Sequence, residues 1–474
     1  MRAPALLVDL YELTMMEGYF QNGLIGQRAV FDVFFRYNPF GGGYSVFAGI
    51  EQAAEYLTGL SFAAEEIDYL ESLGLFSHGF LEHLKSFRFT GSLYAFDEGS
   101  VVFPEEPIAR IEAPLGEAQL VESVLLNILN FQTLIATKAA RICRAAGGRP
   151  VVEFGLRRAQ GGDGALSASR AAYIGGCEGT SNVLAGARYG IPVRGTHAHS
   201  WVMAFDDELS SFRAYADTYP DGAILLVDTY DSRTSGIPNA IRVARELELR
   251  GYRLAGIRLD SGDPLSLCRM ARNMLDEAGL GYVKIVLSNE LDEYVISDLV
   301  KCGVPADVFG VGTRLATGHG EAALSGVYKI AALEKDGFLA PKLKMSDDLP
   351  KGSLPGRKEV ERWYGDDGRM LCDVIHFGER GDGDPLDIHG KAVYAGRPHR
   401  AEKRLRPVVV NGGYATAPPS IEECRSRCWA ELESLPEGLG RLDTPEEYPV
   451  LLDPALFELR RRMIAGIRKN VNGA

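Results

Sequence analysis

Residues Ala223-Ile224-Leu225-Leu226-Val227 form a short run of apolar side chains. It is one of six short, mostly apolar runs, at 151–154, 191–193, 223–227, 254–257, 283–287 and 308–311. Consecutive runs start 25 to 40 residues apart, which is the length of a strand, a helix and two loops. Apolar strands separated by helices are typical of a parallel sheet that is covered on both faces.

Amphipathic stretches lie between these runs. We expect helices over 165–173, 182–189, 237–250 and 264–278. The last of these opens with Pro264 directly after Asp263 and ends before Gly279, which are start and stop signals for a helix. Six strand–helix units in one run favour an α/β barrel, and an open doubly wound sheet is the alternative.

Residues 1–125 have a different pattern. Strand-like runs at 29–35 and around 91–103 alternate with expected helices over 62–73 and 78–84. Prolines punctuate the region, which suits an antiparallel α+β domain.

A long apolar helix over 115–146 then leads into the predicted barrel domain, residues 126–335. Residues 336–474 form a C-terminal extension, expected to pack partly on the N-terminal domain. It contains a Gly/Pro/Lys-rich loop, a few strands and a helical tail from Ile421. We assign no role to the Lys342–Lys358 stretch of that loop.

The composition narrows the possible partners. With 46% hydrophobic and 24% charged residues, the 474-residue chain is typical of globular proteins. Its net charge of −13 argues against broad binding to nucleic acid or to anionic membranes. A small phosphorylated ligand remains compatible, because a few arginines in one pocket outweigh the net charge locally.

The seven cysteines form no pattern of a disulfide framework, which favours a reducing compartment. Cys424 and Cys428 lie four residues apart, but no second Cys/His pair follows to complete a zinc site. No signal-peptide pattern opens the chain, and no apolar stretch approaches the ~20 residues of a membrane span. We therefore expect a cytoplasmic protein.

The carboxyl ends of barrel strands are where catalytic groups collect, and here each of them is polar or glycine-rich. The segments that follow the six runs are Gly155–Arg158, Gly195–Ser200, Asp228–Asp231, Arg258–Asp263, Ser288–Glu290 and Gly310–Thr313. Two adjacent arginines suit phosphate or carboxylate, and aspartates suit ribose hydroxyls or a Mg²⁺ carried by pyrophosphate. Together these segments indicate a sugar-phosphate or nucleotide substrate.

Each feature also has a purely structural interpretation. Arg157 and Arg158 fit a solvated surface, and Gly-x-Gly fits a tight turn. His197 and His199 would share one face of a strand, as two metal ligands do, but neither a Cys nor a third His lies nearby. His199 alone suits a general base, a metal ligand or a nucleophile. The agreement among six strand ends favours a site.

Seven segments in order across about 300 residues make a more specific pattern. They are Asp9–Met15, Phe35–Tyr44, Glu153–Gln160, Gly179–Asn182, Gly195–Ser200, Arg258–Asp263 and Phe309–Thr313. In these segments the chain resembles the nicotinate phosphoribosyltransferase family, of the type II phosphoribosyltransferases.

This resemblance implies a fold and a reaction. The fold is an irregular, incomplete α/β barrel with an N-terminal α/β sandwich, in a homodimer whose active sites lie at the interface. The reaction makes nicotinate mononucleotide and pyrophosphate from nicotinate and phosphoribosyl pyrophosphate (PRPP), in NAD salvage, with ATP hydrolysis coupled to turnover. Mg²⁺ would be carried by PRPP, with no protein side chain expected as its ligand.

The resemblance also implies roles for individual residues. His199 matches the histidine that the family phosphorylates, and Asp228 is the carboxylate that would orient its ring. Asp260 would hold the ribose or stabilise positive charge. The substrate-binding positions are Phe154 with Tyr11 of the other subunit around the pyridine ring, Thr196 and Arg258 at nicotinate, Arg157 at the ribose phosphate, and Gly312 and Thr313 at phosphate.

Nicotinamide and quinolinate are the competing substrates. In relatives that use the amide, an acidic residue follows the Gly-Thr that matches Gly179 and Thr180; here Ser181 follows. A second anion would repel a carboxylate, so Ser181 favours nicotinate. A quinolinate enzyme would hold two carboxylates with more cationic side chains, and would gain nothing from a phosphorylated His199.

Two further classes of protein fit the sequence less well. An aldolase or isomerase acting on a sugar phosphate would usually place a Lys or Glu at a strand end, and strand-end lysines are absent. A non-catalytic nucleotide sensor would not need His199, Arg157, Arg258 and Asp260 together.

Overall fold

The computed structural model describes residues 4–345, 352–381, 383–393 and 397–472. The chain divides into two compact units. The first combines Met1–Leu134 with Ala323–Ala474, and the second is Ile135–Ala322. The chain therefore leaves the first unit once and returns to it.

The second unit is built on a six-stranded parallel sheet in the order β7-β6-β11-β10-β9-β8. The strands are β6 Val151–Glu153, β7 Gly179–Thr180, β8 Ile224–Leu226, β9 Gly256–Leu259, β10 Lys284–Leu287 and β11 Val308–Val311. Five of the six expected strands are confirmed. The sheet keeps two edge strands, β7 and β8, as an incomplete barrel does.

The expected strand at 191–193 is wrong. Val193 makes only an isolated bridge to Thr180, and the strand beside β6 is the two-residue β7. Pro192 has no N–H to donate to a ladder, so the run cannot pair along its length.

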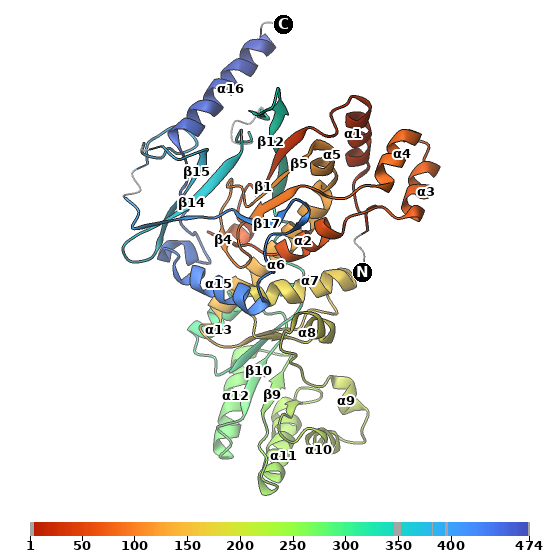
Figure 1. Ribbon diagram of the computed structural model, residues 1–474. Helices are drawn as coiled ribbons and strands as arrows, with labels where there is room; N and C mark the ends of the chain where they lie inside the picture. The colour runs from red at the N-terminus through yellow and green to blue at the C-terminus, as the bar shows by residue number, and fades with distance from the viewer. Residues whose placement is uncertain (1–3, 346–351, 382, 394–396, 473–474) are drawn as a thin grey trace. The chain divides into compact units, whose positions relative to one another are not determined.

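Helices connect these strands; α12 packs beside β9 and β10, and α11 contacts α12 (Figure 1). The helices of this unit are α7 Gly161–Ile174, α8 Val183–Tyr189, α9 His199–Met203, α10 Glu208–Thr218, α11 Ile237–Leu249, α12 Pro264–Glu277, α13 Glu293–Lys301 and α14 Thr313–Ala316. The four helices expected here are confirmed. Asp263 caps α12 by accepting from the Ser266 N–H at 2.9 Å, as its position before Pro264 predicts.

The first unit contains a seven-stranded antiparallel sheet in the order β13-β12-β1-β5-β3-β17-β18. Its strands are β1 Arg28–Phe35, β3 Ser92–Ala95, β5 Ala109–Pro114, β12 Gly326–Lys335, β13 Phe338–Pro341, β17 Arg406–Val410 and β18 Gly413–Tyr414. A four-stranded sheet, β16-β14-β15-β19, joins Arg400–Lys403, Lys358–Tyr364, Met370–Phe377 and Val450–Leu452, and a small pair joins β2 Ser45–Val46 to β4 Val101–Val102. The antiparallel α+β expectation is confirmed.

The helices of the first unit are α1 Leu10–Gln21, α2 Ile50–Gly59, α3 Ala64–Ser72, α4 His78–Lys85, α5 Leu115–Leu120, α15 Ile421–Glu433 and α16 Pro454–Asn472. The long helix expected over 115–146 is two helices, α5 and α6 Glu122–Ala145, separated at Val121. Cys424 and Cys428 are buried in α15. Within the described part of the chain, no helix has both the length and the apolar character needed to cross a bilayer.

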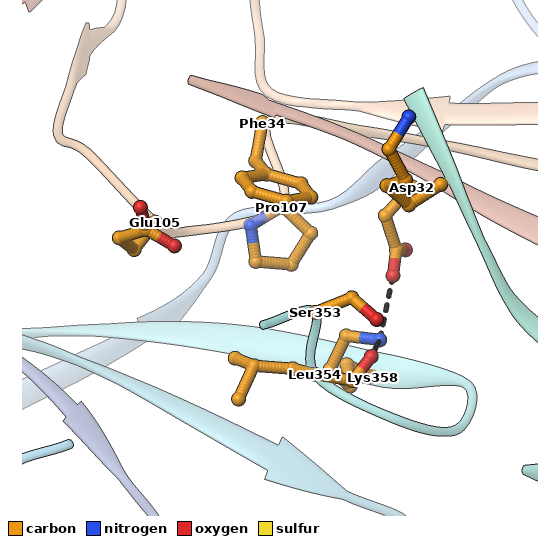
Figure 2. A pocket seen from close by; sticks show the side chains of 8 residues that line it. Asp32, Phe34, Glu105, Pro107, Ser353, Leu354 and Lys358 are labelled. Atoms are coloured by element: carbon orange, nitrogen blue, oxygen red, sulfur yellow. Dashed lines mark hydrogen bonds and ion pairs between the residues drawn. The ribbon is translucent and has the colours of Figure 1, made fainter. Parts of the chain in front are cut away.

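Lys358 is a structural residue of this first unit. Its ammonium lies 2.5 Å from the Asp32 carboxylate of β1, as Figure 2 shows, and it donates to the carbonyls of Leu354 and Gly356 at 2.8 Å. Burial lowers the pKa of Lys358, while Asp32 favours its charged form. Thus one end of the Lys342–Lys358 stretch serves packing; residues 346–351 lie outside the described residues.

We expect Lys358→Met to lower the free energy of unfolding by about 3–5 kcal/mol, because it leaves the buried Asp32 carboxylate without its cationic partner. Asp32→Asn combined with Lys358→Met should lose less than the single variant. Urea denaturation followed by circular dichroism measures both. Lys335→Met, at an exposed position of β12, is the control and should stay within about 0.5 kcal/mol of the parent. Equal losses for both lysine variants would contradict this assignment.

Candidate active site

The Arg258 guanidinium joins the ends of β9 and β10 to the loop that precedes α9 in the second unit. From β9 its Nε donates to the Ser288 hydroxyl at 2.9 Å, one Nη to the Thr196 hydroxyl at 3.2 Å, and the other to the Asp260 carboxylate at 2.9 Å. The side chain is only 15% exposed. These bonds use three of the five N–H groups of an arginine, so two remain for a ligand.

Two aspartates lie behind this arginine. Asp260 also accepts from the Ser288 hydroxyl at 2.5 Å. Asp228, after β8, accepts with one oxygen from the Asp260 N–H at 2.9 Å and from the Ser261 hydroxyl at 2.6 Å. Its other oxygen, Oδ1, is buried without a hydrogen bond to the described residues. An unmet buried acceptor of this kind is expected where a ligand donates.

Phe154 follows β6 and lies beside the same arginine. Its ring centroid is 5.3 Å from the Arg258 Cζ. A Cβ placed on Gly310 would lie 2.5 Å from the ring, so only glycine in β11 leaves room for the aromatic side chain. The structure therefore brings together Phe154 and Arg258, two positions expected to contact one aromatic, anionic ligand.

His199 is the first residue of α9. Its Nδ1 lies 3.1 Å from the Thr229 hydroxyl, and its ring forms no hydrogen bond to Asp228, the residue that the resemblance implies. Asp228 has its oxygen Oδ2 committed to Asp260 and Ser261, and a hydroxyl takes the place of the expected carboxylate at the imidazole. The orienting contact expected of Asp228 is thus made by Thr229 in this structure.

His197 belongs to the core. It is 7% exposed, its Nε2 accepts from the Leu226 N–H at 3.1 Å, and its Nδ1 lies 3.4 Å from the Ala198 carbonyl. Burial lowers its pKa, and the nearby Arg258 lowers it further. Because Nε2 accepts a backbone N–H and Nδ1 faces a carbonyl, both ring nitrogens are engaged by the protein and are not available as metal ligands beside His199. No group of three or more His, Cys, Asp or Glu among the described residues could hold a metal ion.

The remaining predicted residues occupy more open positions. Arg157 is exposed in the loop after β6, and Gly312 and Thr313 lie where β11 meets α14. Tyr11 belongs to the first unit, in α1, with 44% of its side chain exposed. Burial and then the charges of Glu122 and Glu12 raise the pKa of Tyr11 to about 12, so its phenol is neutral.

Sequence reasoning gave no role to Glu153, Thr229 or Ser288. Glu153 and Thr229 are neighbours of the predicted Phe154 and Asp228, and all three residues without a predicted role lie at or just after a strand end. Their hydrogen bonds connect segments 16 to 30 residues apart in the chain, and no local sequence pattern predicts such pairs. Their position at a strand end is the one sequence feature that could have indicated them. Other strand-end residues share that feature without contacting the site residues.

Comparison with known proteins places this geometry in a family. Three sequence profiles match nearly end to end: the nicotinate phosphoribosyltransferase (NAPRTase) N-terminal domain over 6–130, the NAPRTase family over 150–363 and the nicotinate phosphoribosyltransferase C-terminal domain over 357–460.

Individual relatives agree over almost the whole length. The chain is 42% identical to nicotinate phosphoribosyltransferase of Bacillus subtilis, covering 98% of this chain and 96% of the relative. It is 37% identical to nicotinate phosphoribosyltransferase 2 of Arabidopsis thaliana, covering 96% and 93%. The crystal structure of human nicotinic acid phosphoribosyltransferase superposes with a TM-score of 0.84 at 32% identity, covering 96% and 99%. The chain therefore belongs to the nicotinate phosphoribosyltransferase family.

Proposed function

We propose that the protein forms nicotinate mononucleotide and pyrophosphate from nicotinate and PRPP, and so acts in NAD biosynthesis by salvage. The observation that carries the proposal is the pair Phe154 and Arg258. An aromatic face stands beside a guanidinium that has two N–H groups to spare. A pyridine ring can stack on the first while its carboxylate accepts from the second.

The chemistry needs no nucleophile from the protein. The pyridine nitrogen has a lone pair at neutral pH and attacks the anomeric carbon of PRPP. The new N–C bond forms as the C–O bond to pyrophosphate breaks, and pyrophosphate leaves with the electron pair. Positive charge develops on the ribose carbon, which the carboxylates of Asp228 and Asp260 would stabilise. Arg157, Gly312 and Thr313 would hold phosphate groups, and the protein's main contribution is positioning.

Mg²⁺ is proposed to enter with PRPP. The unmet Oδ1 of Asp228 and the exposed part of Asp260 provide oxygen atoms, which suit a hard cation or the water molecules around it. When bound, the ion would neutralise charge on the departing pyrophosphate.

ATP is proposed as a co-substrate that phosphorylates His199. The γ-phosphoryl group would pass to a ring nitrogen as ADP leaves, giving a high-energy N–P bond. Phosphorylation of His199 drives turnover only if the phosphoryl group interacts more favourably with one conformation of the protein than with another. The contact between His199 and Thr229 is a hydrogen bond that phosphorylation would alter, and this supports the proposal.

The product mixture tests the reaction directly. Purified protein receives PRPP and Mg²⁺ with nicotinate, nicotinamide and quinolinate together, with and without ATP, and mass spectrometry identifies the nucleotides. We expect nicotinate mononucleotide as the product, raised by ATP. A His199→Ala variant should form it at a rate that ATP does not change.

Other outcomes are equally informative. A nicotinamide nucleotide would overturn the substrate and keep the reaction class. Formation of no nucleotide would leave a family fold without its reaction. Stimulation of His199→Ala by ATP would exclude the proposed phosphohistidine.

Ser181 is the proposed discriminator between acid and amide. Ser181→Asp should lower kcat/KM for nicotinate by at least about tenfold, because a carboxylate would face the substrate carboxylate. Its effect on nicotinamide should be smaller. Ser181→Asn has the same size without the charge and should affect nicotinate much less. Steady-state kinetics with both substrates measures this, and equal losses in the two variants would show a steric effect instead.

Tyr11 is proposed to act on the active site of a second subunit in a homodimer. Tyr11→Ala and His199→Ala proteins, each lacking ATP-stimulated activity, are mixed under conditions of subunit exchange. Half of the dimers then carry one intact site, so about a quarter of the parent's ATP-stimulated rate should return. Mass spectrometry first establishes that the subunits have exchanged. If no activity returns after that exchange, the active site is not shared between subunits.

A further inference from the structure

Glu153, the last residue of β6, is a buried carboxylate with no cation beside it. It is 1% exposed, and no Lys, Arg or His among the described residues forms an ion pair with it. A buried anion is costly unless hydrogen bonds replace its hydration. A fold that needed only packing here would place an apolar residue at this position, as β6 does at Val151.

Hydrogen-bond donors surround both oxygens of this carboxylate. Oε1 accepts from the backbone N–H of Gly155. Oε2 accepts from the Thr180 hydroxyl at 2.5 Å and from the Ser169 hydroxyl at 3.0 Å. The Ser169 hydroxyl also lies 2.9 Å from the Ala165 carbonyl, so the donors committed to Glu153 are Gly155 and Thr180.

Asn182 donates to the two hydroxyl oxygens that lie beside Glu153. The Thr180 oxygen accepts from the Asn182 N–H at 2.9 Å, and the Ser169 oxygen accepts from the Asn182 side-chain amide at 3.2 Å. With its oxygen accepting, the Thr180 hydroxyl has its proton to donate to Glu153, while the Ser169 proton is shared between Glu153 and the Ala165 carbonyl. The site therefore demands an acceptor at both positions of residue 153, which a carboxylate supplies and a neutral amide does not.

The carboxylate holds two segments in a fixed relation. Gly155 follows Phe154 directly, and a Cβ on Gly155 would lie 2.3 Å from the Ala316 Cβ, so the loop has no room to move inward. On the other side, Thr180 precedes Ser181, whose own N–H donates to the Glu153 carbonyl at 2.9 Å. Phe154 and Ser181 are the two residues proposed above to meet the pyridine ring and its substituent.

We propose that Glu153 is a positioning residue that sets the spacing between Phe154 and Ser181, and through it the recognition of the pyridine substrate. The inference rests on the proposed function for its substrate, but the spacing itself is a property of the fold. Glu153 touches neither substrate and takes no part in bond making.

Glu153→Gln tests the proposal with almost no change of volume. Whichever way the amide turns, its NH₂ faces either the Gly155 N–H or the two hydroxyls, and one segment must move. We expect the KM for nicotinate to rise by about 10- to 100-fold, since small misplacements of a substrate have effects of this size. The KM for PRPP should rise less than the KM for nicotinate, because only Arg157 of the proposed phosphate-binding residues lies on this loop, while Gly312 and Thr313 follow β11.

Thr180 supplies a matched pair of variants. Thr180→Val keeps the shape and removes the hydroxyl, so it should raise the KM for nicotinate as Glu153→Gln does. Thr180→Ser keeps the hydroxyl and should behave like the parent. In the double variant Glu153→Gln/Thr180→Val, the two effects should not add, because both break one network. If Glu153→Gln does not fold, the two Thr180 variants still test whether this network positions Phe154 and Ser181.

Hydrogen–deuterium exchange separates the positioning role from the reaction. Glu153→Gln should speed exchange in peptides covering 154–157 and 180–182, with the helices of the unit unchanged. If the parent makes no nucleotide, the proposed function fails, while this exchange pattern still supports the positioning role. Unchanged exchange at both segments, or equal rises in KM for nicotinate and PRPP, would overturn the proposal and leave Glu153 a residue of general stability.

Discussion

The guanidinium of Arg258 is the interaction on which the carboxyl edge of the second unit depends. Parallel strands bring their ends to one edge, but they do not by themselves align the side chains there. Arg258 does so by donating to Ser288 after β10, to Thr196 ahead of α9 and to Asp260 at the end of its own strand. Since β9 pairs with both β10 and the edge strand β8, this contact lies one strand in from the β8 edge of the sheet. Truncating the arginine would leave three buried or half-buried polar groups without their donor.

The two carboxylates of this edge differ in what they have left to offer. Asp260 is neutralised by Arg258 and bonded to Ser288, so its charge is already compensated. Asp228 receives only neutral donors on Oδ2 and keeps Oδ1 unmet. Of the two carboxylates, Asp228 is therefore the one without a cationic partner among the described residues. This explains why Asp228 is better suited to the ribose or to Mg²⁺ than to holding His199 in the present arrangement.

The sequence was sufficient for features governed by local rules. Periodicity predicted β8 to β11, and the Asp263-Pro264 signal predicted the start of α12, because both depend on neighbouring residues. The same rules failed at 191–193, where a proline prevents pairing, and at His197, whose burial depends on packing beside Tyr215 of α10. Which hydroxyl meets His199, and what holds Glu153, are settled by contacts between distant segments. The family resemblance named the site residues without specifying those supporting contacts.

The carboxyl edge of the parallel sheet combines a tightly packed residue, Phe154, with a residue that makes few contacts, His199. Phe154 is enclosed by Gly310 and anchored through Gly155 to Glu153, and each contact leaves no space for an alternative position. His199, in contrast, has one side-chain hydrogen bond to the residues that the structure describes, to Thr229, and follows a segment without regular structure from Arg194 to Ala198. Coupling to ATP requires an element with two arrangements that the phosphoryl group distinguishes. In the proposed coupling, the start of α9 would be the element that shifts, while the pyridine-binding side would stay fixed and would preserve substrate recognition in both states.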